Sequence, residues 1–341
     1  MLAGGDINNR RNDVPGQISL YKRGIGGETD NIFVKLMRGL GGNLRQQTVP
    51  MHKMLQEVYE EGDKIYIIGY SRGAAAARKF ATELDEKGLK TTSNGYVEKP
   101  PVEFLGCFET VALQLSRNIF KIIRTRRKGT LTKSSVVGEK GGKIPLIVKT
   151  AVHNVALDDN RFRSLPLPFP PVFMDSDDKR VHETWFAGEH GDIGGTYYEK
   201  GMPDYSCKYM QEWMEILGIS FIQPKEINSE SLKIDDYPDV KLNKTDFDIF
   251  PKASDKLHLQ SPQINNPSYR PVVTVTNNEI IEGGTVRIHV SVLHHMSAME
   301  KNCTPYKINP NIKETNNVVV VGFKDTVLEA ETKTFKELLE L

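Results

Sequence analysis

The sequence is poor in cysteine. Only three of its 341 residues are cysteines, namely Cys107, Cys207 and Cys303. They are far apart and lack the paired spacing of a zinc site or a disulfide framework. We therefore expect reduced thiols that are buried or idle.

Long apolar runs are absent as well. Nowhere do about 18 apolar residues follow one another, which is the length that a membrane-spanning helix requires. Residues 1–12 also lack the apolar core of a secretory signal peptide. From this we expect a protein that is cytoplasmic as synthesised and that does not enter the general secretory route by a signal of its own.

Neither sign of charge dominates the chain. Lys and Arg together number 45 and Asp and Glu 44, which leaves a formal net charge of +1. Without a global positive field we predict no nucleic-acid partner, and any partner attracted by charge must bind a local patch. The length is sufficient for one large core or two modest ones.

A serine between glycines is the most informative motif that is present. Gly69-Tyr70-Ser71-Arg72-Gly73 follows an apolar run at 64–68 and precedes an alanine-rich stretch. This order predicts a strand, a sharp turn and a helix, with the two glycines leaving room for strand and helix to cross. The motif predicts Ser71 as a nucleophile at the carboxyl end of a strand. The alternative is a plain glycine-rich connection.

Apolar and polar segments alternate along the chain in the manner of an α/β protein. Helical periodicity is present at 31–40 and 49–60, and the helix after Ser71 should end before Gly88. Further buried strands are expected at 102–108, 146–157, 184–188, 272–275, 285–292 and 318–323. This pattern predicts a mostly parallel sheet with helices on both faces, whose sites lie at the carboxyl ends of strands.

The composition changes after Gln223, where the chain becomes polar and is punctuated by proline. We therefore predict a catalytic core at 1–222 and a C-terminal extension at 223–341 that packs on the same domain. Within the core, residues 117–143 form a basic insertion.

The basic insertion passes from an apolar stretch into a cationic one that includes Arg124, Arg126, Arg127 and Lys128. Such a segment suits a lid that contacts a membrane, because apolar side chains enter the acyl boundary while cations meet lipid phosphates. The alternative is a helix packed on the sheet and followed by a solvated basic loop.

A serine hydroxyl needs a histidine to accept its proton and an acid to orient that histidine. His190 lies just past the strand at 184–188 in a glycine-rich segment, 188–195, which we expect to be a tight loop. This is where the base of a hydrolase must lie. The alternative is a solvated or capping histidine.

Several carboxylates could serve as the acid. Glu109 ends the strand at 102–108, Asp158 and Asp159 end the next strand, and Asp192 lies beside His190. Position alone does not choose among them, because a carboxylate at a strand end is often a cap or turn residue.

Two other roles are open to the histidines. His153 is most simply a core or strand-end histidine. A metal site that uses His190 and Asp192 with further ligands is an alternative, although the chain lacks metalloprotease spacing. We predict no metal and no cofactor.

Several segments together resemble a known family. They are Gly69-Tyr70-Ser71-Arg72-Gly73-Ala74 with Arg78, then 106–111, 153–158 and 185–195, and finally 288–292 followed by Pro305-Tyr306. In this order they are similar to the bacterial α/β hydrolases that include the first class of lipase effectors delivered by type VI secretion. The resemblance covers most of the chain.

The resemblance implies the α/β-hydrolase fold and a triad of Ser71, His190 and Glu109 that cleaves a carboxylic ester, in characterised members a phospholipid acyl ester. The choice of Glu109 comes from the resemblance. It also implies an oxyanion hole formed by the N–H of Arg72 and the loop that contains Gly5 and Asp6.

The same resemblance implies several partners. We expect a lipid or small ester as substrate and a transient contact with a membrane surface. A component of a secretion apparatus or an immunity protein is a further expected partner, with export by a signal-independent secretion system.

Two features depart from the family. The family usually has aspartate where this chain has Glu109, and it opens with a strand that leads into a D-G-T-x-N-N loop. Here residues 1–9 resemble the inside of that element, so we expect part of the family's first strand to be lacking. One alternative is therefore a truncated, catalytically impaired hydrolase-fold protein that binds lipid or a partner. A soluble esterase or thioesterase is the other.

Overall fold

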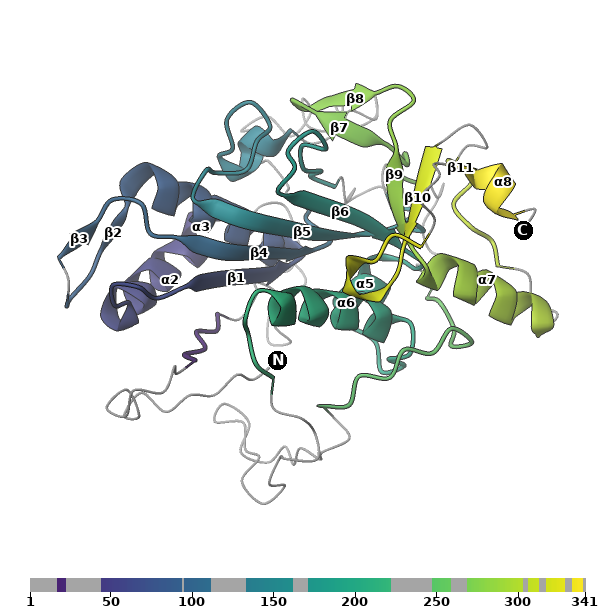
Figure 1. Cartoon of the computed structure of the whole chain (residues 1–341), viewed down its shortest axis with the longest axis horizontal. Coiled ribbons are helices and arrows are strands. Elements are labelled where there is room, and N and C mark those ends of the chain that lie inside the picture. Colours follow the sequence, from purple (N-terminus) through teal and green to yellow (C-terminus); the bar gives the residue numbers. More distant parts are fainter. Residues whose placement is uncertain are drawn as a thin grey trace, which may run out of the picture.

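A twisted sheet forms the centre of the computed structural model (Figure 1). The structure describes residues 17–22, 44–93, 95–111, 133–161, 171–221, 247–258, 269–302, 306–312, 317–328 and 333–339. Within these ranges the central sheet has seven strands in the order β1-β4-β5-β6-β9-β10-β11. Neighbouring strands are parallel except for β10 and β11. The mostly parallel sheet expected from the sequence is therefore present.

The elements have the following bounds. The strands are β1 Ile65–Tyr70, β2 Leu89–Lys90, β3 Tyr96–Val97, β4 Val102–Phe108, β5 Val148–Ala156, β6 Val181–Phe186, β7 Thr274–Thr276, β8 Glu279–Ile281, β9 Val286–His289, β10 Asn317–Val321 and β11 Lys333–Thr334. The helices are α2 Arg45–Val58, α3 Arg72–Lys87, α5 His190–Gly194, α6 Pro203–Ile216, α7 Ser291–Lys301 and α8 Phe335–Leu339, with short 3-10 turns at Ser134–Val137 and Phe323–Asp325.

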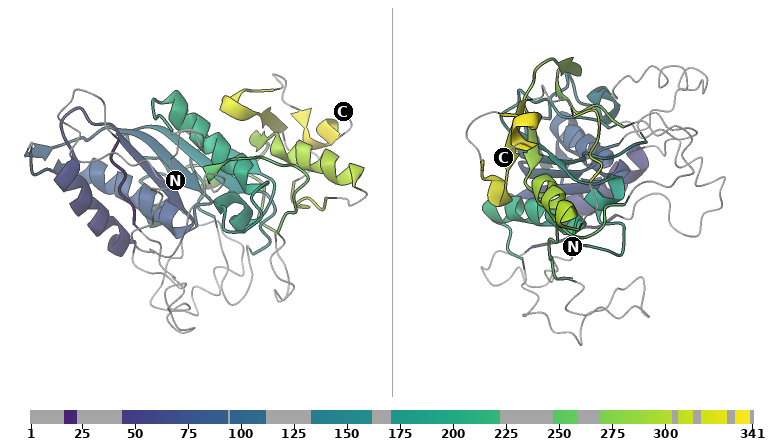
Figure 2. Two further views of the ribbon diagram at one scale, coloured as in Figure 1. Left: turned by 90° about the horizontal axis from the view of Figure 1, so that it is seen from below. Right: turned by 90° about the vertical axis from the view of Figure 1, so that its right-hand side faces the viewer.

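Helices cover both faces of the sheet. In Figure 2, α2 and α3 lie on one side of the strands and α6 lies on the other. The side chains of β4 alternate accordingly, because successive residues of a strand point to opposite faces. Phe104 belongs to the core that includes Met210 of α6, whereas Leu105 belongs to the core that includes Leu84 of α3. This two-sided burial explains why the central strands are apolar along their whole length.

The C-terminal segment contributes strands to the same sheet. β9 pairs in parallel with β6 through Thr184 opposite Arg287 and Trp185 opposite Ile288, and β10 follows β9. This pairing supports the proposal that residues 223–341 pack on the same domain as residues 1–222. None of the helices in the described ranges combines the length and apolarity needed to cross a membrane.

Some elements differ from the sequence predictions. Helix α2 begins at Arg45 and carries Pro50 inside it, whereas 49–60 was expected. The strand expected at 285–292 ends at His289, and α7 begins at Ser291. The helix expected at 31–40 lies outside the described residues.

Helix α6 was not predicted, although two signals mark its start. Pro203 occupies the first turn, where its missing N–H costs nothing, and Asp204 lies in the same turn near the positive end of the helix dipole. This helix matters for the site because it covers the face of the sheet opposite α3.

Candidate active site

Ser71 occupies the sharp turn between β1 and α3. Its backbone has φ 60° and ψ −123°, a conformation that residues other than glycine rarely adopt. The turn is held by hydrogen bonds on both sides: the N–H of Ser71 donates to the carbonyl of Phe108 at 2.9 Å, and its carbonyl accepts from the N–H of Ala74 at 3.1 Å. The strained backbone is the geometry expected of a nucleophile elbow.

The two glycines of the motif have different roles. A Cβ atom on Gly69 would lie 2.5 Å from the carbonyl carbon of Gly73, so only glycine allows β1 and α3 to cross this closely. A Cβ on Gly73 would meet no described atom within 4 Å. The sequence argument assigned the close crossing to both glycines, and the structure requires it only at Gly69.

His190 is the first residue of α5, just past the carboxyl end of β6. Most of the segment 188–195, expected to be a loop, forms the short helix α5. The first turn of this helix is stabilised by reciprocal capping between Glu189 and Asp192. The Glu189 carboxylate accepts from the N–H of Gly191 at 2.7 Å, and the Asp192 carboxylate accepts from the N–H of Glu189 at 3.0 Å. Tyr70 adds a hydrogen bond from its hydroxyl to the His190 carbonyl at 3.2 Å.

Glu109 follows directly after β4 with φ 50°, so its backbone is also in the left-handed region. Its N–H donates to the carbonyl of Asn154 on the neighbouring strand at 2.8 Å. The strands β1, β4, β5 and β6 are consecutive in the sheet, and all four are parallel. Residues that follow their carboxyl ends therefore meet at one edge of the sheet.

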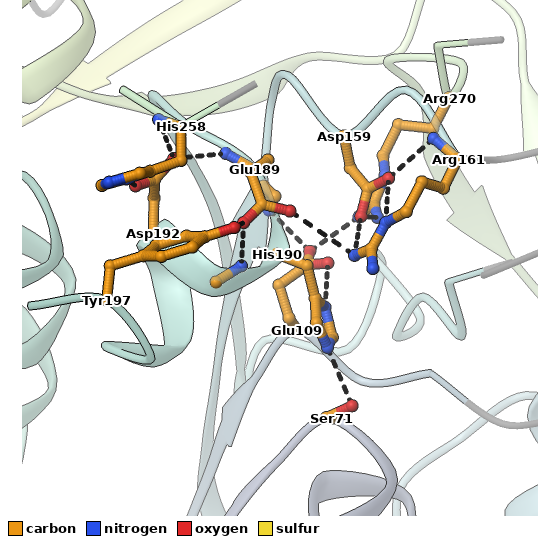
Figure 3. A network of polar contacts seen from close by, with 12 residues as sticks. Ser71, Glu109, Asp159, Arg161, Glu189, His190, Asp192, Tyr197, His258 and Arg270 are labelled. Atoms are coloured by element: carbon orange, nitrogen blue, oxygen red, sulfur yellow. Dashed lines mark hydrogen bonds and ion pairs between the residues drawn. The ribbon is translucent and has the colours of Figure 1, made fainter. Parts of the chain in front are cut away.

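At this edge the structure brings Ser71, His190 and Glu109 into one line of contacts (Figure 3). The Oγ of Ser71 lies 2.8 Å from Nε2 of His190, and Nδ1 of His190 lies 3.1 Å from Oε2 of Glu109. Glu109 is 1% exposed and His190 is 7% exposed. Both ring nitrogens of the histidine are thus engaged, one with a hydroxyl and the other with a carboxylate.

The alternative acids form different contacts. Asp158 accepts hydrogen bonds from the N–H groups of Gly188 and Asn309 at 2.7 and 3.0 Å, and from the hydroxyl of Tyr306. Burial raises the pKa of Asp158 to about 7, although these donors act in the opposite direction. Asp158 therefore ties the segment before α5 to the C-terminal part of the chain.

Asp192 turns toward His258. Its Oδ1 lies 2.7 Å from Nδ1 of His258, whose Nε2 lies 2.8 Å from the carboxylate of Glu199. Burial raises the pKa of Asp192 to about 6, with His258 opposing the rise. Together with its cap on Glu189, this contact makes Asp192 a residue that holds α5.

His153 is fully buried on β5. Its Nε2 accepts from the N–H of Thr110 at 3.0 Å, and its Nδ1 lies 2.7 Å from a carboxylate oxygen of Glu183. Both nitrogens have partners within the core, as expected for a core histidine.

Sequence reasoning missed a buried charge network behind the glutamate. Arg270 is fully buried, and its Nη1 donates to Oε1 of Glu109 at 2.6 Å while its Nη2 lies 3.0 Å from Asp159 (Figure 3). Asp159 also pairs with Arg161 at 2.8 Å, and Arg161 lies 3.6 Å from Glu189. No local motif marks Arg270, which follows Glu109 by 161 positions.

The network sets the charge of both carboxylates. Burial alone would raise the pKa of Glu109, but the charge of Arg270 and the hydrogen bond with His190 outweigh it and lower this pKa to about 2. For Asp159, burial is likewise outweighed by Arg270 and Arg161, so its pKa lies well below the usual range. Both groups are therefore ionised at neutral pH.

Glu109, Asp159 and His190 offer ligand atoms that lie within 4.8 Å of one another, which is a spacing that a metal ion could use. The guanidinium of Arg270, however, already contacts both carboxylates. A cation there would compete with a buried positive charge, so these residues fit a metal ion poorly.

Cys107 and Cys207 are held as thiols. Burial raises the pKa of Cys107 to about 12 and that of Cys207 to about 11. Neither is therefore a reactive thiolate at neutral pH. Cys303 lies outside the described residues.

Of the residues predicted for the oxyanion hole, Arg72 is the first residue of α3, directly after Ser71. Gly5 and Asp6 lie outside the described residues. So do the membrane-facing candidates Arg124, Arg126, Arg127 and Lys128 of the basic insertion.

A family model matches the chain at residues 6–99 and 90–214, which together span more than half of its 341 residues. The family is described as type VI secretion system (T6SS), phospholipase effector Tle1-like, catalytic domain. The chain therefore belongs to the Tle1-like phospholipase effector family.

Two solved structures have limited similarity to the chain. A crystal structure of an uncharacterized protein from Pseudomonas aeruginosa is 20% identical, with a TM-score of 0.32 over 62% of this chain and 29% of that one. A structure of the Tle1 effector bound to the VgrG spike of the type 6 secretion system is 22% identical, with a TM-score of 0.29 over 44% of this chain and 29% of that one. The alignment thus covers less than a third of either neighbour. No curated protein sequence matches the chain.

Proposed function

We propose that this protein is a serine phospholipase with the α/β-hydrolase fold, in which Ser71, His190 and Glu109 form the catalytic triad. One observation carries the proposal. The hydroxyl of Ser71, both ring nitrogens of His190 and the carboxylate of Glu109 form an unbroken line of contacts at 2.8 and 3.1 Å at the carboxyl edge of a parallel sheet. Family membership supports a lipid ester as the substrate class.

The first half of the reaction forms an acyl enzyme. Ser71 Oγ attacks the carbonyl carbon of the ester while Nε2 of His190 takes the hydroxyl proton. Glu109 accepts the hydrogen bond from Nδ1–H and stabilises the imidazolium that forms. When the tetrahedral intermediate collapses, the proton on Nε2 passes to the leaving alcohol oxygen, and the acyl group remains on Ser71.

The second half of the reaction releases the acid. A water molecule loses a proton to Nε2 of His190 and attacks the acyl carbon. Collapse of the second tetrahedral intermediate returns the proton to Ser71 Oγ and frees the carboxylic acid. Each half uses the same histidine once as base and once as acid, so no cofactor enters the proposed cycle.

The negative charge on the carbonyl oxygen requires donors in both halves of the reaction. The N–H of Arg72 follows the nucleophile and opens α3, so it combines the position of an oxyanion donor with the positive end of a helix dipole. We propose the loop containing Gly5 and Asp6 as the source of the second donor, on the strength of the sequence resemblance. Loss of one such donor lowers turnover by about a hundredfold or more.

Family membership also supports the route by which the protein reaches its substrate. As a T6SS effector of the Tle1-like type it would be exported without a signal peptide. The proposed partners are a component of the secretion apparatus, an immunity protein and the surface of the target membrane.

A fluorophosphonate probe tests the proposal, because it labels only an activated serine. The parent protein should be labelled and should hydrolyse phospholipid vesicles, while Ser71→Ala should lose both properties without losing solubility. Ser176→Ala is a matched control, since Ser176 is exposed and its hydroxyl lies 3.1 Å from that of Thr276, away from the triad.

The outcomes separate the candidate functions. Labelling together with vesicle hydrolysis supports a phospholipase, whereas labelling with turnover of soluble esters alone supports a soluble esterase. Persistent hydrolysis by purified Ser71→Ala would end the triad proposal. A parent protein that binds vesicles but neither reacts with the probe nor cleaves any ester would favour a binding protein that has lost catalysis.

A further inference from the structure

We propose that Arg270 is a positioning residue for the reaction: it fixes the carboxylate of Glu109 so that Oε2 faces His190. This inference rests on the proposed triad and goes beyond it. Arg270 comes from a part of the chain far from Glu109 in sequence, yet its Nη1 lies 2.6 Å from Oε1 of Glu109 (Figure 3). Both side chains are buried, at 0% and 1% exposure.

The two carboxylate oxygens of Glu109 have different partners, which supports this role. Oε1 of Glu109 accepts from the N–H of Ala156 at 2.6 Å and from Arg270 at 2.6 Å, while Oε2 contacts His190. A glutamate has one more rotatable bond than an aspartate, and its backbone here is already in the left-handed region. Two hydrogen-bond donors on Oε1 restrict the additional side-chain rotation that glutamate has relative to aspartate.

Arg270 is itself held by its backbone. Its N–H donates to the carbonyl of Asp159 at 3.2 Å, and its carbonyl accepts from the side-chain amides of Asn309 and Asn311 at 3.0 and 3.1 Å. The backbone of Arg270 is therefore anchored between the residues that follow β5 and the C-terminal part of the chain, and the guanidinium extends from this anchored position. A group anchored in this way can orient a neighbour to within a fraction of an ångström, which catalysis requires.

The charge of Arg270 matters as much as its geometry. Two carboxylates, Glu109 and Asp159, lie close together in the same buried region, and two like charges there would favour uptake of a proton by one of them. Arg270 contacts both and offsets their repulsion. Among the described residues, the charged or titratable groups that interact electrostatically with Glu109 include Arg270, His190, Asp159, Arg161 and Tyr70.

Removal of the positive charge of Arg270 should raise the pKa of Glu109. With Arg270 present, its charge outweighs the effect of burial and keeps the pKa of Glu109 at about 2. Without it, Glu109 would bind a proton at higher pH, because burial and the charge of Asp159 both raise its pKa. As the pH falls, the ionised acid needed for catalysis would then be lost at a higher pH than in the parent. A loss of stability alone would not cause this change.

The test uses the pH dependence of kcat/KM on a soluble ester with the full chain. Arg270→Gln should lower kcat by about 10- to 100-fold with little change in KM, because orientation is lost while the substrate contacts remain. The acidic limb of the profile should move to higher pH. Arg270→Lys restores the positive charge without the planar guanidinium. Its acidic limb should return part of the way to the parent's position, and its kcat should be restored to a smaller extent.

A matched control isolates the effect of burying an arginine. Arg78 is also fully buried and is paired with Glu139 at 2.7 Å, on the α3 side of the sheet. Arg78→Gln should lower stability as Arg270→Gln does, but the folded enzyme should keep the parent's acidic limb. If Arg270→Gln fails to fold, the Arg270→Gln/Asp159→Asn double variant removes one buried carboxylate with the arginine. Its kcat should fall as in the single variant, while its acidic limb should move less, because loss of the Asp159 charge offsets part of the loss of the Arg270 charge. Arg270→Lys carries the test in either case.

The outcomes distinguish this inference from the proposed function. If folded Arg270→Gln has the parent's kcat and acidic limb, or the double variant in its place has the parent's kcat, while Ser71→Ala is inactive, the positioning role is overturned and the triad stands. An unchanged kcat in Arg270→Lys together with an unchanged kcat in the double variant would overturn it equally. Full activity of Ser71→Ala would instead overturn the triad itself.

Discussion

Replacement of Glu109 by glutamine tests the acid most directly, because the surrounding donors dictate how the amide must lie. Oε1 of Glu109 accepts from the N–H of Ala156 and from Arg270, both at 2.6 Å. In the Glu109→Gln variant only the amide oxygen could take that place, so the amide NH₂ would face Nδ1 of His190. The opposite rotamer would set the NH₂ against two donors and leave both unsatisfied.

This orientation reverses the tautomer of the histidine. An NH₂ group cannot accept from Nδ1–H, so Nδ1 would become the acceptor and the proton would move to Nε2. That atom lies 2.8 Å from Ser71 Oγ and could no longer take the hydroxyl proton. The corresponding change in a serine protease triad lowers kcat by about 10⁴-fold, so we expect a loss of this order here. In free energy it corresponds to about 5 kcal/mol of transition-state stabilisation.

The assay compares three carboxamide variants under one set of conditions. kcat on a soluble ester and the rate of fluorophosphonate labelling are measured for Glu109→Gln, Asp158→Asn and Asp192→Asn, with circular dichroism to establish the folded fraction. Asp158 and Asp192 hold the backbone around α5, so their variants should lose less than about tenfold in kcat per folded molecule, since the triad contacts remain. A larger loss in either of them than in Glu109→Gln would refute the reasoning and relocate the acid.

Two further predictions concern stability. Gly69→Ala should destabilise the protein by about 3 kcal/mol, because its Cβ would overlap the backbone of Gly73, whereas Gly73→Ala should be neutral or stabilise α3 by up to about 1 kcal/mol; urea unfolding measures both, and an equal cost at the two sites would contradict the packing of β1 on α3. Burial raises the pKa of Asp158 from 3.8 to about 7, so this group's contribution to stability is fully present below about pH 4 and is lost as the pH rises through about 7. Asp158→Asn cannot ionise, so the stability that it loses relative to the parent should shrink between about pH 4 and pH 7 by on the order of 4 kcal/mol. Urea unfolding of both proteins across this range gives the difference, and one that stays constant or grows would show that Asp158 does not carry a raised pKa.

The local sequence was sufficient for the turn at Ser71. The strand, the turn and the helix that form it are contiguous at residues 64–87, so neighbouring residues in sequence are also the residues in contact. The same holds for the strand at 102–108, which the structure reproduces residue for residue. His190 was identified for a similar reason, since the strand before it and the glycines around it are local features.

Short-range capping was the first point at which the sequence argument failed. The segment 188–195 was expected to be a loop because it is rich in glycine. It is helical because Glu189 and Asp192 cap each other's backbone, a pairing that differs from the usual serine or threonine pattern. The sequence carries no comparable signal that a helix begins at Ser291. The strand was therefore expected to run to residue 292, whereas it ends at His289.

By itself, the sequence determined a mostly parallel α/β architecture, the strained turn at Ser71 and the position of His190 beyond a strand, because each depends on residues that are neighbours along the chain. Position along the chain did not choose among Glu109, Asp158, Asp159 and Asp192, since each follows a strand or lies beside His190, and the choice of Glu109 came from the family resemblance alone. Only the tertiary structure decided which carboxylate faces Nδ1 of His190, because strand order and side-chain direction follow from packing across the whole sheet. Arg270 belongs entirely to the tertiary structure: a buried carboxylate needs a positive partner, and the folded chain supplies it from 161 residues away.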